Sequence, residues 1–233
     1  MLTEDYIALI LVYAIIGCSL AIAMVAEKRT SLDSRKIIHI GVGSFVFVWW
    51  MFSEQWIMLV FFTIPFAVLL FLAMMKDNAV AKSKLGELSQ KKGHKTGLFL
   101  YAITITIMVL FFFGDHWTAA SVGIMAMTWG DGMGSVIGRR YGKHKILNGK
   151  SLEGSLGVFL ATFIMSAVII LFYAYLASIG QFPAGEYTAI LPIWAVCAIA
   201  GGLAAVLEAV SPGEIDNLVI PIVIATVMAF LGL

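Results

Sequence analysis

The chain has 233 residues, of which 61% are hydrophobic and 12% are charged, and its mean hydropathy is +0.98. A soluble globular domain carries about 25% charged residues, so this composition excludes an ordinary soluble domain and indicates a polytopic helical membrane protein. The net charge of +1 is uninformative about partners.

Apolar runs follow one another along the chain, separated by short polar turns. The first run, at about residues 6–26, comes after an acidic N-terminus, whereas a signal peptide begins with basic residues, so a retained transmembrane helix is expected. Residues 38–75 are apolar except at 53–55. One helix of that length would be about 57 Å long, nearly twice the hydrocarbon thickness of a bilayer. Two helices joined by a turn at 53–55 are therefore predicted.

The remaining runs lie beyond a basic loop at residues 76–95. Helices are predicted at about residues 97–113, 117–138, 153–177, 189–210 and 217–233. The longest polar stretch, residues 76–96, is too short to bury a core of its own. The whole chain, 1–233, is therefore expected to form a single transmembrane domain.

The basic residues are segregated along the chain. All 15 Lys and Arg lie within residues 27–36, 76–96 or 139–150. In an alternating arrangement of eight helices these three segments share one side of the membrane, and by the positive-inside rule that side is cytoplasmic. We therefore expect an all-α, multi-pass protein of the cell or inner membrane with about eight spans and both termini on the non-cytoplasmic side.

A carboxylate, Asp131, lies inside one apolar run, about two helical turns before Arg139. An ionisable group at that depth is costly unless it faces a cavity, a cation or a partner, so a functional role is expected. Asp131, Ser135 and Arg139 are spaced by four residues and share a helix face. Phosphates with bound Mg²⁺ would span the gap from Asp131 to Arg139; the alternative is an interhelical hydrogen bond or a pairing with a lysine.

Glycines recur at every fourth position through the same segment, as Gly130, Gly134, Gly138 and Gly142. This spacing is typical of close helix packing, and it also allows phosphates to approach the backbone. Gly130 and Gly134 fit both interpretations. Gly138 and Gly142 lie at the helix end, where exposed amides and basic side chains favour anion binding.

The turn after this helix is basic, and the next helix begins at a polar sequence. The basic residues of the turn are Arg139, Arg140, Lys143, Lys145 and Lys150. Ser151 is placed to cap the next helix, and Glu153 to complement its positive N-terminus. The clustered charges indicate phosphate binding, and the alternative is an ordinary topology signal.

Two further polar segments are predicted on the same side of the membrane. An early elbow carries Arg35, Lys36 and His39, either as a membrane-surface anchor or as part of the same site. A turn near the C-terminus is acidic, with the residues Glu208, Glu214, Asp216 and Asn217. Carboxylates opposite a basic turn suit metal or substrate-hydroxyl binding, whereas Asp216 is also placed to cap the last helix.

These segments resemble the nucleotide motif of CTP-dependent lipid kinases. The resemblance is carried by Gly-Asp-Gly at 130–132, Gly-Arg-Arg-Tyr-Gly at 138–142 and Lys-Ser-Leu-Glu-Gly at 150–154. Residues 35–39 are similar to the family's basic-His motif, and residues 208–221 to its acidic element. The family includes phytol, farnesol and dolichol kinases and CTP-using diacylglycerol kinases, and is related to phosphatidate cytidylyltransferases. The Gly-Asp-Gly form is more similar to phytol kinases than to cytidylyltransferases.

The resemblance implies an enzyme that transfers the γ-phosphate of CTP, or of another nucleoside triphosphate, to a prenol such as phytol, farnesol or geranylgeraniol at the cytoplasmic face. Mg²⁺ is the implied cofactor, with Asp131 and Asp216 as metal ligands. The implied catalytic residues are Asp131, Glu153, His39 and Asp216, and which of the last three deprotonates the alcohol is left open. The implied nucleotide-binding residues are Gly134, Ser135, Gly138, Arg139, Arg140, Gly142, Lys145, Lys150, Ser151 and Gly154. Substrate contact or a supporting role is expected of Arg35, Lys36, Glu208 and Asn217.

Other activities remain open at this point. A cytidylyltransferase or a CTP-dependent diacylglycerol kinase would use a similar motif, and a lipid-phosphate or anion transporter would use a similar basic cleft. No inverted repeat supports the transporter. The expected partners are a membrane lipid alcohol, a nucleoside triphosphate and the bilayer, with no nucleic acid. The choice of lipid and nucleotide and the formation of a homodimer are left open.

Overall fold

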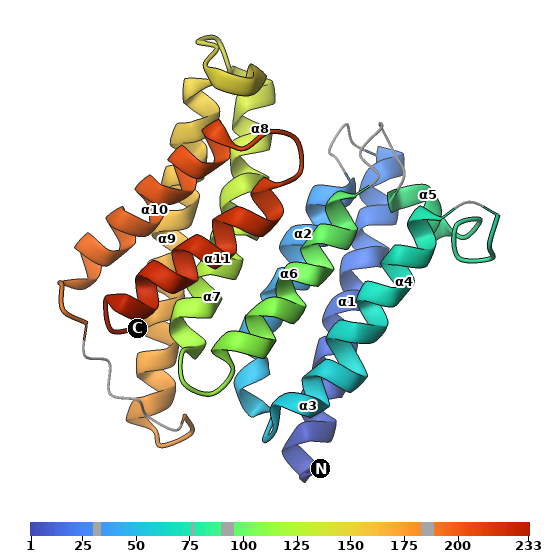
Figure 1. Cartoon of the computed structure of the whole chain (residues 1–233), viewed down its shortest axis with the longest axis vertical. Helices are drawn as coiled ribbons and strands as arrows, with labels where there is room; N and C mark the ends of the chain where they lie inside the picture. The colour runs from blue at the N-terminus through green and yellow to red at the C-terminus, as the bar shows by residue number, and fades with distance from the viewer. Residues whose placement is uncertain (30–33, 76, 90–95, 183–188) are drawn as a thin grey trace. The chain divides into compact units, whose positions relative to one another are not determined.

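The computed structural model describes residues 1–29, 34–75, 77–89, 96–182 and 189–233. Within these residues the chain is helical and contains no β-strand beyond one isolated bridge. The helices form two compact units, Met1–Phe111 and Phe112–Leu233, and Figure 1 labels them in chain order. The predicted single domain is not tested by this division, and each unit is described by itself. The side chains outside the described set are those of Lys28, Arg35, Lys84, Leu88 and Ser89.

The first unit consists of antiparallel apolar helices. Its elements are α1 (Thr3–Arg29), α2 (Ser34–Gly43), the 3-10 turns η1 (Ser44–Phe47) and η2 (Trp49–Met51), α3 (Gln55–Met58), the π-helical turn η3 (Leu59–Thr63), α4 (Ile64–Met74), α5 (Lys84–Ser89) and α6 (Gly97–Phe112). Its core is aromatic, because the Phe45 ring meets the Trp49 and Phe62 rings edge-on at centroid distances of 5.5 and 5.2 Å.

A turn at residues 52–54 separates the two helices predicted within residues 38–75, which confirms the turn. The fully buried carboxylate of Asp5 accepts hydrogen bonds from the backbone N–H of Ser53 at 2.8 Å and from its hydroxyl. The Gln55 amide donates to the carbonyls of Val109 and Leu110. The start of α1, this turn and the end of α6 therefore meet at one end of the unit.

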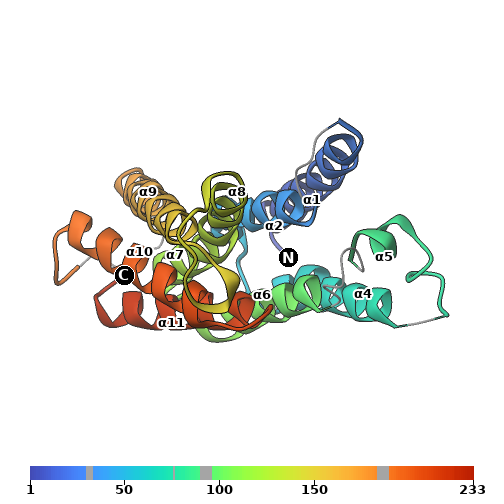
Figure 2. The same cartoon turned by 90° about the horizontal axis from the view of Figure 1, so that it is seen from above.

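The second unit carries most of the predicted polar motifs. Its elements are α7 (Trp117–Met125), the π-helical turn η5 (Ala126–Gly130), α8 (Asp131–Tyr141), the 3-10 turn η6 (Leu147–Gly149), α9 (Leu152–Ser178), α10 (Ile193–Val210) and α11 (Asp216–Phe230). The helix α9 packs along α8 and α10, and α11 packs against α7 and α10 (Figure 2). The segments α7, η5 and α8 form one continuous helical run, which matches the helix predicted at 117–138.

Among the described residues, four helices are long and apolar enough to cross a bilayer, so the chain is a helical membrane protein. They are Thr3–Glu27, Gln55–Met74, Leu152–Ser178 and Ile193–Val210. Shorter apolar helices occupy Lys36–Met51, Gly97–Phe112 and Asp216–Phe230. A total of eight membrane spans and the orientation of the termini stay predictions.

Candidate functional site

The carboxylate of Asp131 is positioned by a change in helix type. Asp131 is the first residue of α8 and directly follows the π-helical turn η5. A π-helical turn inserts an extra residue per turn and is frequent at functional sites. The side chain is almost fully buried, and a buried carboxylate requires a cation or strong hydrogen-bond donors nearby.

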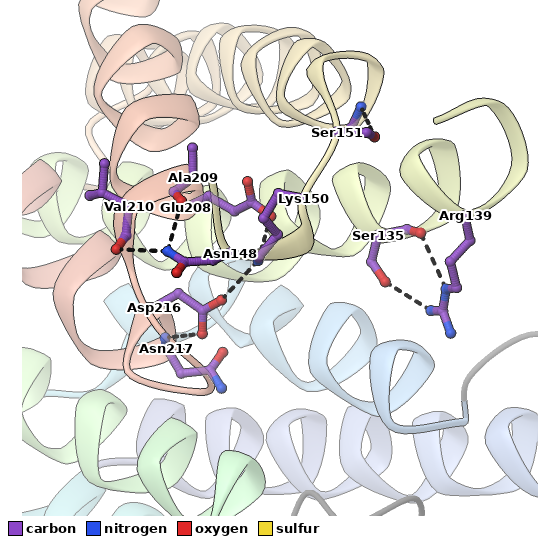
Figure 3. Close-up of polar contacts among 11 residues, drawn as sticks. Ser135, Arg139, Asn148, Lys150, Ser151, Glu208, Ala209, Val210, Asp216 and Asn217 are labelled. Carbon is purple, nitrogen blue, oxygen red and sulfur yellow. Dashed lines mark hydrogen bonds and ion pairs between the residues drawn. The ribbon is translucent and has the colours of Figure 1, made fainter. Parts of the chain in front are cut away.

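A lysine in the turn before α9 contacts two buried carboxylates of the second unit. The Lys150 ammonium lies 2.5 Å from Glu208 Oε1 and 3.5 Å from Asp216 Oδ2 (Figure 3), and the charge of Asp131 also acts on it. Burial opposes the charged form of Lys150, but the hydrogen bond to Glu208 and the three negative charges outweigh it and raise the pKa of the ammonium above its usual value. We call Asp131, Lys150, Glu208 and Asp216 the Lys150 cluster, which combines three carboxylates with one ammonium.

The position of Lys150 is fixed by its neighbour Asn148. Asn148 adopts the left-handed backbone conformation with φ of 51°, and its side-chain amide donates to the carbonyls of Ala209 and Val210, both at 3.1 Å (Figure 3). These carbonyls lie at the C-terminal end of α10, and the last turn of α10 carries Glu208. The turn is therefore tied to the end of α10, which places Lys150 beside Glu208. Sequence reasoning missed Asn148, although Asn followed by Gly149 is a turn signal.

The carboxylate of Glu153 organises the same turn. It accepts hydrogen bonds from the backbone N–H of Lys143 at 3.1 Å and of His144 at 3.3 Å, and His144 Nδ1 lies 2.7 Å from it. Ser151 caps α9 as expected, because its hydroxyl accepts a hydrogen bond from the Gly154 N–H at 3.2 Å. The structure thus gives Glu153 a role in holding the turn, and its catalytic role stays a prediction.

The glycine series forms a close contact between α8 and α9. A Cβ atom on Gly134 would lie 2.3 Å from a methyl carbon of Val158 and 3.1 Å from the Gly154 carbonyl oxygen, and one on Gly130 would lie 2.4 Å from the Thr162 hydroxyl. A Cβ on Gly138 would lie 3.2 Å from the Ser151 hydroxyl. Packing therefore requires glycine at Gly130 and Gly134, while contact of Gly134, Gly138, Gly142 and Gly154 with a nucleotide stays a prediction.

The basic residues of the turn divide into two groups. Arg139 folds back on Ser135, donating to its hydroxyl at 2.8 Å and to its carbonyl at 3.2 Å, and Figure 3 shows this pair apart from Lys150. Arg140 lies 5.4 Å from the centre of the Tyr141 ring. Arg139, Arg140 and Lys145 are exposed, whereas Lys150 is half-buried among carboxylates. The exposed group is accessible to an anion from solution.

The Lys150 cluster has a buried acceptor that would suit a magnesium ion. Glu208 Oε2 is buried and has no hydrogen-bond partner among the described residues, so an acceptor remains for a cation or a donor. The described part of the chain has no group of three or more His, Cys, Asp or Glu close enough to form a complete metal site. Magnesium is usually held by one or two carboxylates together with phosphates and water, and Asp131 and Asp216 as its ligands stay a prediction.

The last predicted residues lie in both units. In α11 the N–H of Asn217 donates to Asp216 Oδ1 at 2.9 Å, and Asn217 is buried beside the cluster residue Asp216. In the first unit His39 is buried in α2, where its ring stacks on Tyr101 at a centroid distance of 4.4 Å. Lys36 is half-buried in the same helix. The side chain of Arg35 lies outside the described set. The roles of Arg35, Lys36 and His39 stay predictions.

Curated proteins of similar sequence are lipid kinases. A phytol kinase of Synechocystis sp. is 32% identical over 215 residues, which is 87% of this chain and 83% of that protein. A probable chloroplastic phytol kinase of Triticum aestivum is 30% identical over 63% of this chain, and the match spans about half (51%) of that protein. The CTP-dependent diacylglycerol kinase 1 of Schizosaccharomyces pombe is 32% identical over 59% of this chain and 61% of that protein.

No protein-family model matches the chain, and no solved structure matches it.

Proposed function

The chain belongs to the family of the phytol kinases, and on this premise we propose that it phosphorylates the hydroxyl of a membrane-dissolved prenol, with CTP as the donor. The kinase names of the relatives support a lipid kinase. CTP as donor is supported by the name of the CTP-dependent diacylglycerol kinase. The Lys150 cluster is the observation that carries the proposal, because it places buried carboxylates and a cation beside an exposed basic turn.

In the proposed reaction the alcohol oxygen forms a bond to the γ-phosphorus of CTP as the bond from that phosphorus to the bridging oxygen breaks. CDP leaves, and the proton of the alcohol passes to a carboxylate or to water. Arg139, Arg140 and Lys145 face the aqueous side, where they neutralise phosphate charge, and Lys150 stabilises the charge that develops on the leaving oxygen. Asp216 is the carboxylate proposed to orient the alcohol.

Magnesium, bound by the carboxylates Asp131 and Asp216 together with the phosphates, would neutralise charge on the triphosphate. The residues themselves align the phosphate chain. Phosphoryl transfer depends on positioning and electrostatic stabilisation, and the fixed turn from Lys143 to Ser151 provides both. The proposed side of the membrane is the cytoplasm, because the positive-inside rule places the basic loops there and nucleotides are found there.

Purified protein in detergent with phytol, Mg²⁺ and CTP labelled at the γ-phosphorus tests the proposal. Label is expected on the lipid, and CTP labelled at the α-phosphorus should leave the lipid unlabelled. Transfer of the α-label would instead identify a cytidylyltransferase. Absence of any phosphorylated lipid across farnesol, geranylgeraniol, phytol, dolichol and diacylglycerol would favour a transporter.

Asp131→Asn provides the site-specific test. The amide is close in size to the carboxylate but carries no charge, so we expect activity to fall by about 100-fold or more while the protein still inserts into the membrane and elutes as the wild type does. Turnover close to that of the wild type would remove Asp131 from the site. Ser178→Ala, at the far end of α9, is the matched control and should keep full activity.

A further inference from the structure

The basic turn between α8 and α9 is a small hairpin. The backbone N–H of Ile146 donates to the Lys150 carbonyl at 3.0 Å, and that of Leu152 donates to the His144 carbonyl at 2.9 Å. An isolated antiparallel bridge joins its two arms. The side chain of Asn148 ties the tip of the hairpin to α10. The contacts at the base of the hairpin therefore decide where its basic side chains lie.

His144 holds the base of the hairpin through three of its own groups. Its carbonyl accepts the hydrogen bond from Leu152, while its backbone N–H and its ring Nδ1 lie 3.3 and 2.7 Å from Glu153 Oε1. An ionised carboxylate only accepts hydrogen bonds, so Nδ1 carries the hydrogen. The Lys143 N–H donates to the other carboxylate oxygen at 3.1 Å. Three donors of the turn therefore converge on one carboxylate at the start of α9.

The contact of the His144 ring acts locally, because its side chain is 74% exposed and an exposed ion pair contributes little to the stability of a protein. The contact fixes the backbone between two exposed basic residues, Lys143 and Lys145. A lysine side chain has a flexible stem and binds a phosphate as a point charge. Fixing the backbone from which the stem starts reduces the conformational freedom that is lost on binding.

We propose that His144 positions the basic turn for the nucleotide by donating to Glu153, and that Glu153 acts through the turn and is not the base that deprotonates the alcohol. The inference rests on the proposed kinase activity and goes beyond it by giving His144 a role. A general base must lie within hydrogen-bond reach of the proton that it takes, whereas the Glu153 carboxylate faces donors of its own turn. Asp216 and His39 remain as candidates for the base.

His144→Leu and His144→Asn form a matched pair. The amide nitrogen of asparagine takes a place close to that of Nδ1 and donates to Glu153, whereas leucine has no donor. His144→Leu is expected to raise the KM for CTP about tenfold, as for the loss of one hydrogen bond to a charged group. Its kcat should stay within about twofold of the wild type, because the turn binds substrate and transition state alike. His144→Asn should restore the KM of the wild type.

Trypsin cleavage of the protein in detergent follows the turn without any need for activity. Cleavage after Lys143 and Lys145 is expected to be about tenfold faster in His144→Leu than in the wild type, because a protease cuts the population in which the turn has opened. Cleavage after Lys82, an exposed residue of the first unit, should be equal in all variants. Unchanged cleavage of the turn in His144→Leu, or an equal increase in His144→Asn, overturns the positioning role.

Glu153→Gln tests the second part of the proposal. The amide keeps one acceptor oxygen for the turn, so the KM for CTP should rise while kcat stays within about twofold of the wild type. A general base contributes about 100-fold or more to the rate, so a fall in kcat of that size at saturating CTP would identify Glu153 as the base and overturn this part. If the wild type phosphorylates no alcohol, the proposed function fails, while the trypsin cleavage still tests the positioning by His144.

Discussion

At the scale of single residues, the Lys150 ammonium compensates the buried negative charges of Glu208 and Asp216. Its raised pKa keeps the ammonium protonated, so its contribution to stability is complete below the unfolded pKa of about 10.4. That contribution is lost only as the pH rises through the higher folded value. Neutral and mildly alkaline solutions therefore leave the ammonium of Lys150 intact beside Glu208 and Asp216.

Replacing Lys150 tests both how much the ion pairs of its ammonium stabilise the protein and whether the carboxylates bind Mg²⁺. Lys150→Met keeps the apolar stem but leaves Glu208 and Asp216 buried without their cation, which should destabilise the protein by about 3–5 kcal/mol. With the ammonium gone, Mg²⁺ alone should raise the thermal midpoint of the variant more than that of the wild type. The midpoint is followed in detergent with and without Mg²⁺, and Ca²⁺ is compared.

Lys150→Arg is the control, because it keeps the charge and should show the smaller Mg²⁺ response of the wild type. An equal response of Lys150→Met and wild type to Mg²⁺ would contradict a cation site at the carboxylates. Activity is not needed for this measurement.

At the scale of elements, the close contact between α8 and α9 positions the turn that carries the basic residues of the candidate site. The glycines let the two backbones approach, so that the turn between the helices is short enough for Glu153 to reach the amides of Lys143 and His144. Small residues replace hydrophobic attraction as the basis of helix association in a bilayer, because lipid tails are as apolar as side chains.

Gly134→Ala measures that packing. The added methyl would meet Val158 and the Gly154 carbonyl, so we expect a loss of about 1–3 kcal/mol and a shorter half-life of activity on heating. Gly202→Ala is the control, because a Cβ on Gly202 in α10 meets no other atom within 4 Å, and alanine favours a helix by about 1 kcal/mol over glycine. If both variants lost stability equally, the close contact would not be what requires glycine.

The sequence predicts the helices well because burial in a bilayer requires long apolar runs, and the turns at 52–54, 142–151 and 211–215 interrupt those runs visibly. It also singles out Asp131, Lys150 and Asp216 one by one, since charges stand out in apolar surroundings, but it does not pair Lys150 with Asp216. It does not predict the π-helical turns, which depend on backbone hydrogen bonds that no residue type specifies. The bonds of Glu153 to the turn and of Asn148 to α10 also escape it, because each depends on the three-dimensional path of a loop.

At the scale of the whole molecule, the segregation of Lys and Arg remains the main constraint on orientation. Two contacts within the second unit agree with antiparallel helices: His116 Nδ1 lies 3.3 Å from the Leu233 carbonyl oxygen, and Asn148 contacts the end of α10. The turn carrying His116 and the C-terminal end are therefore on one side of the second unit. The basic turn instead contacts the C-terminal end of α10, through Asn148.

Cysteine labelling in intact cells tests the orientation. In a background with Cys18→Ala and Cys197→Ala, a membrane-impermeant maleimide should modify Asp115→Cys but not Leu147→Cys, since only the former is expected outside the cytoplasm. Both positions are exposed. After the cells are opened, both should react. Labelling of Leu147→Cys before opening would reverse the predicted orientation.

The basic turn is held to α10 by the side-chain amide of Asn148, and that amide is open to slow chemical change. Asparagine is among the thermolabile residues, and an Asn-Gly pair is prone to deamidation because glycine leaves its backbone nitrogen unhindered for attack on the side-chain amide. Conversion of Asn148 to a carboxylate would remove the two donors to Ala209 and Val210 and place a negative charge against the carbonyl end of α10. The turn that presents Lys150 would then lose its anchor through slow chemical ageing, without any change in the gene.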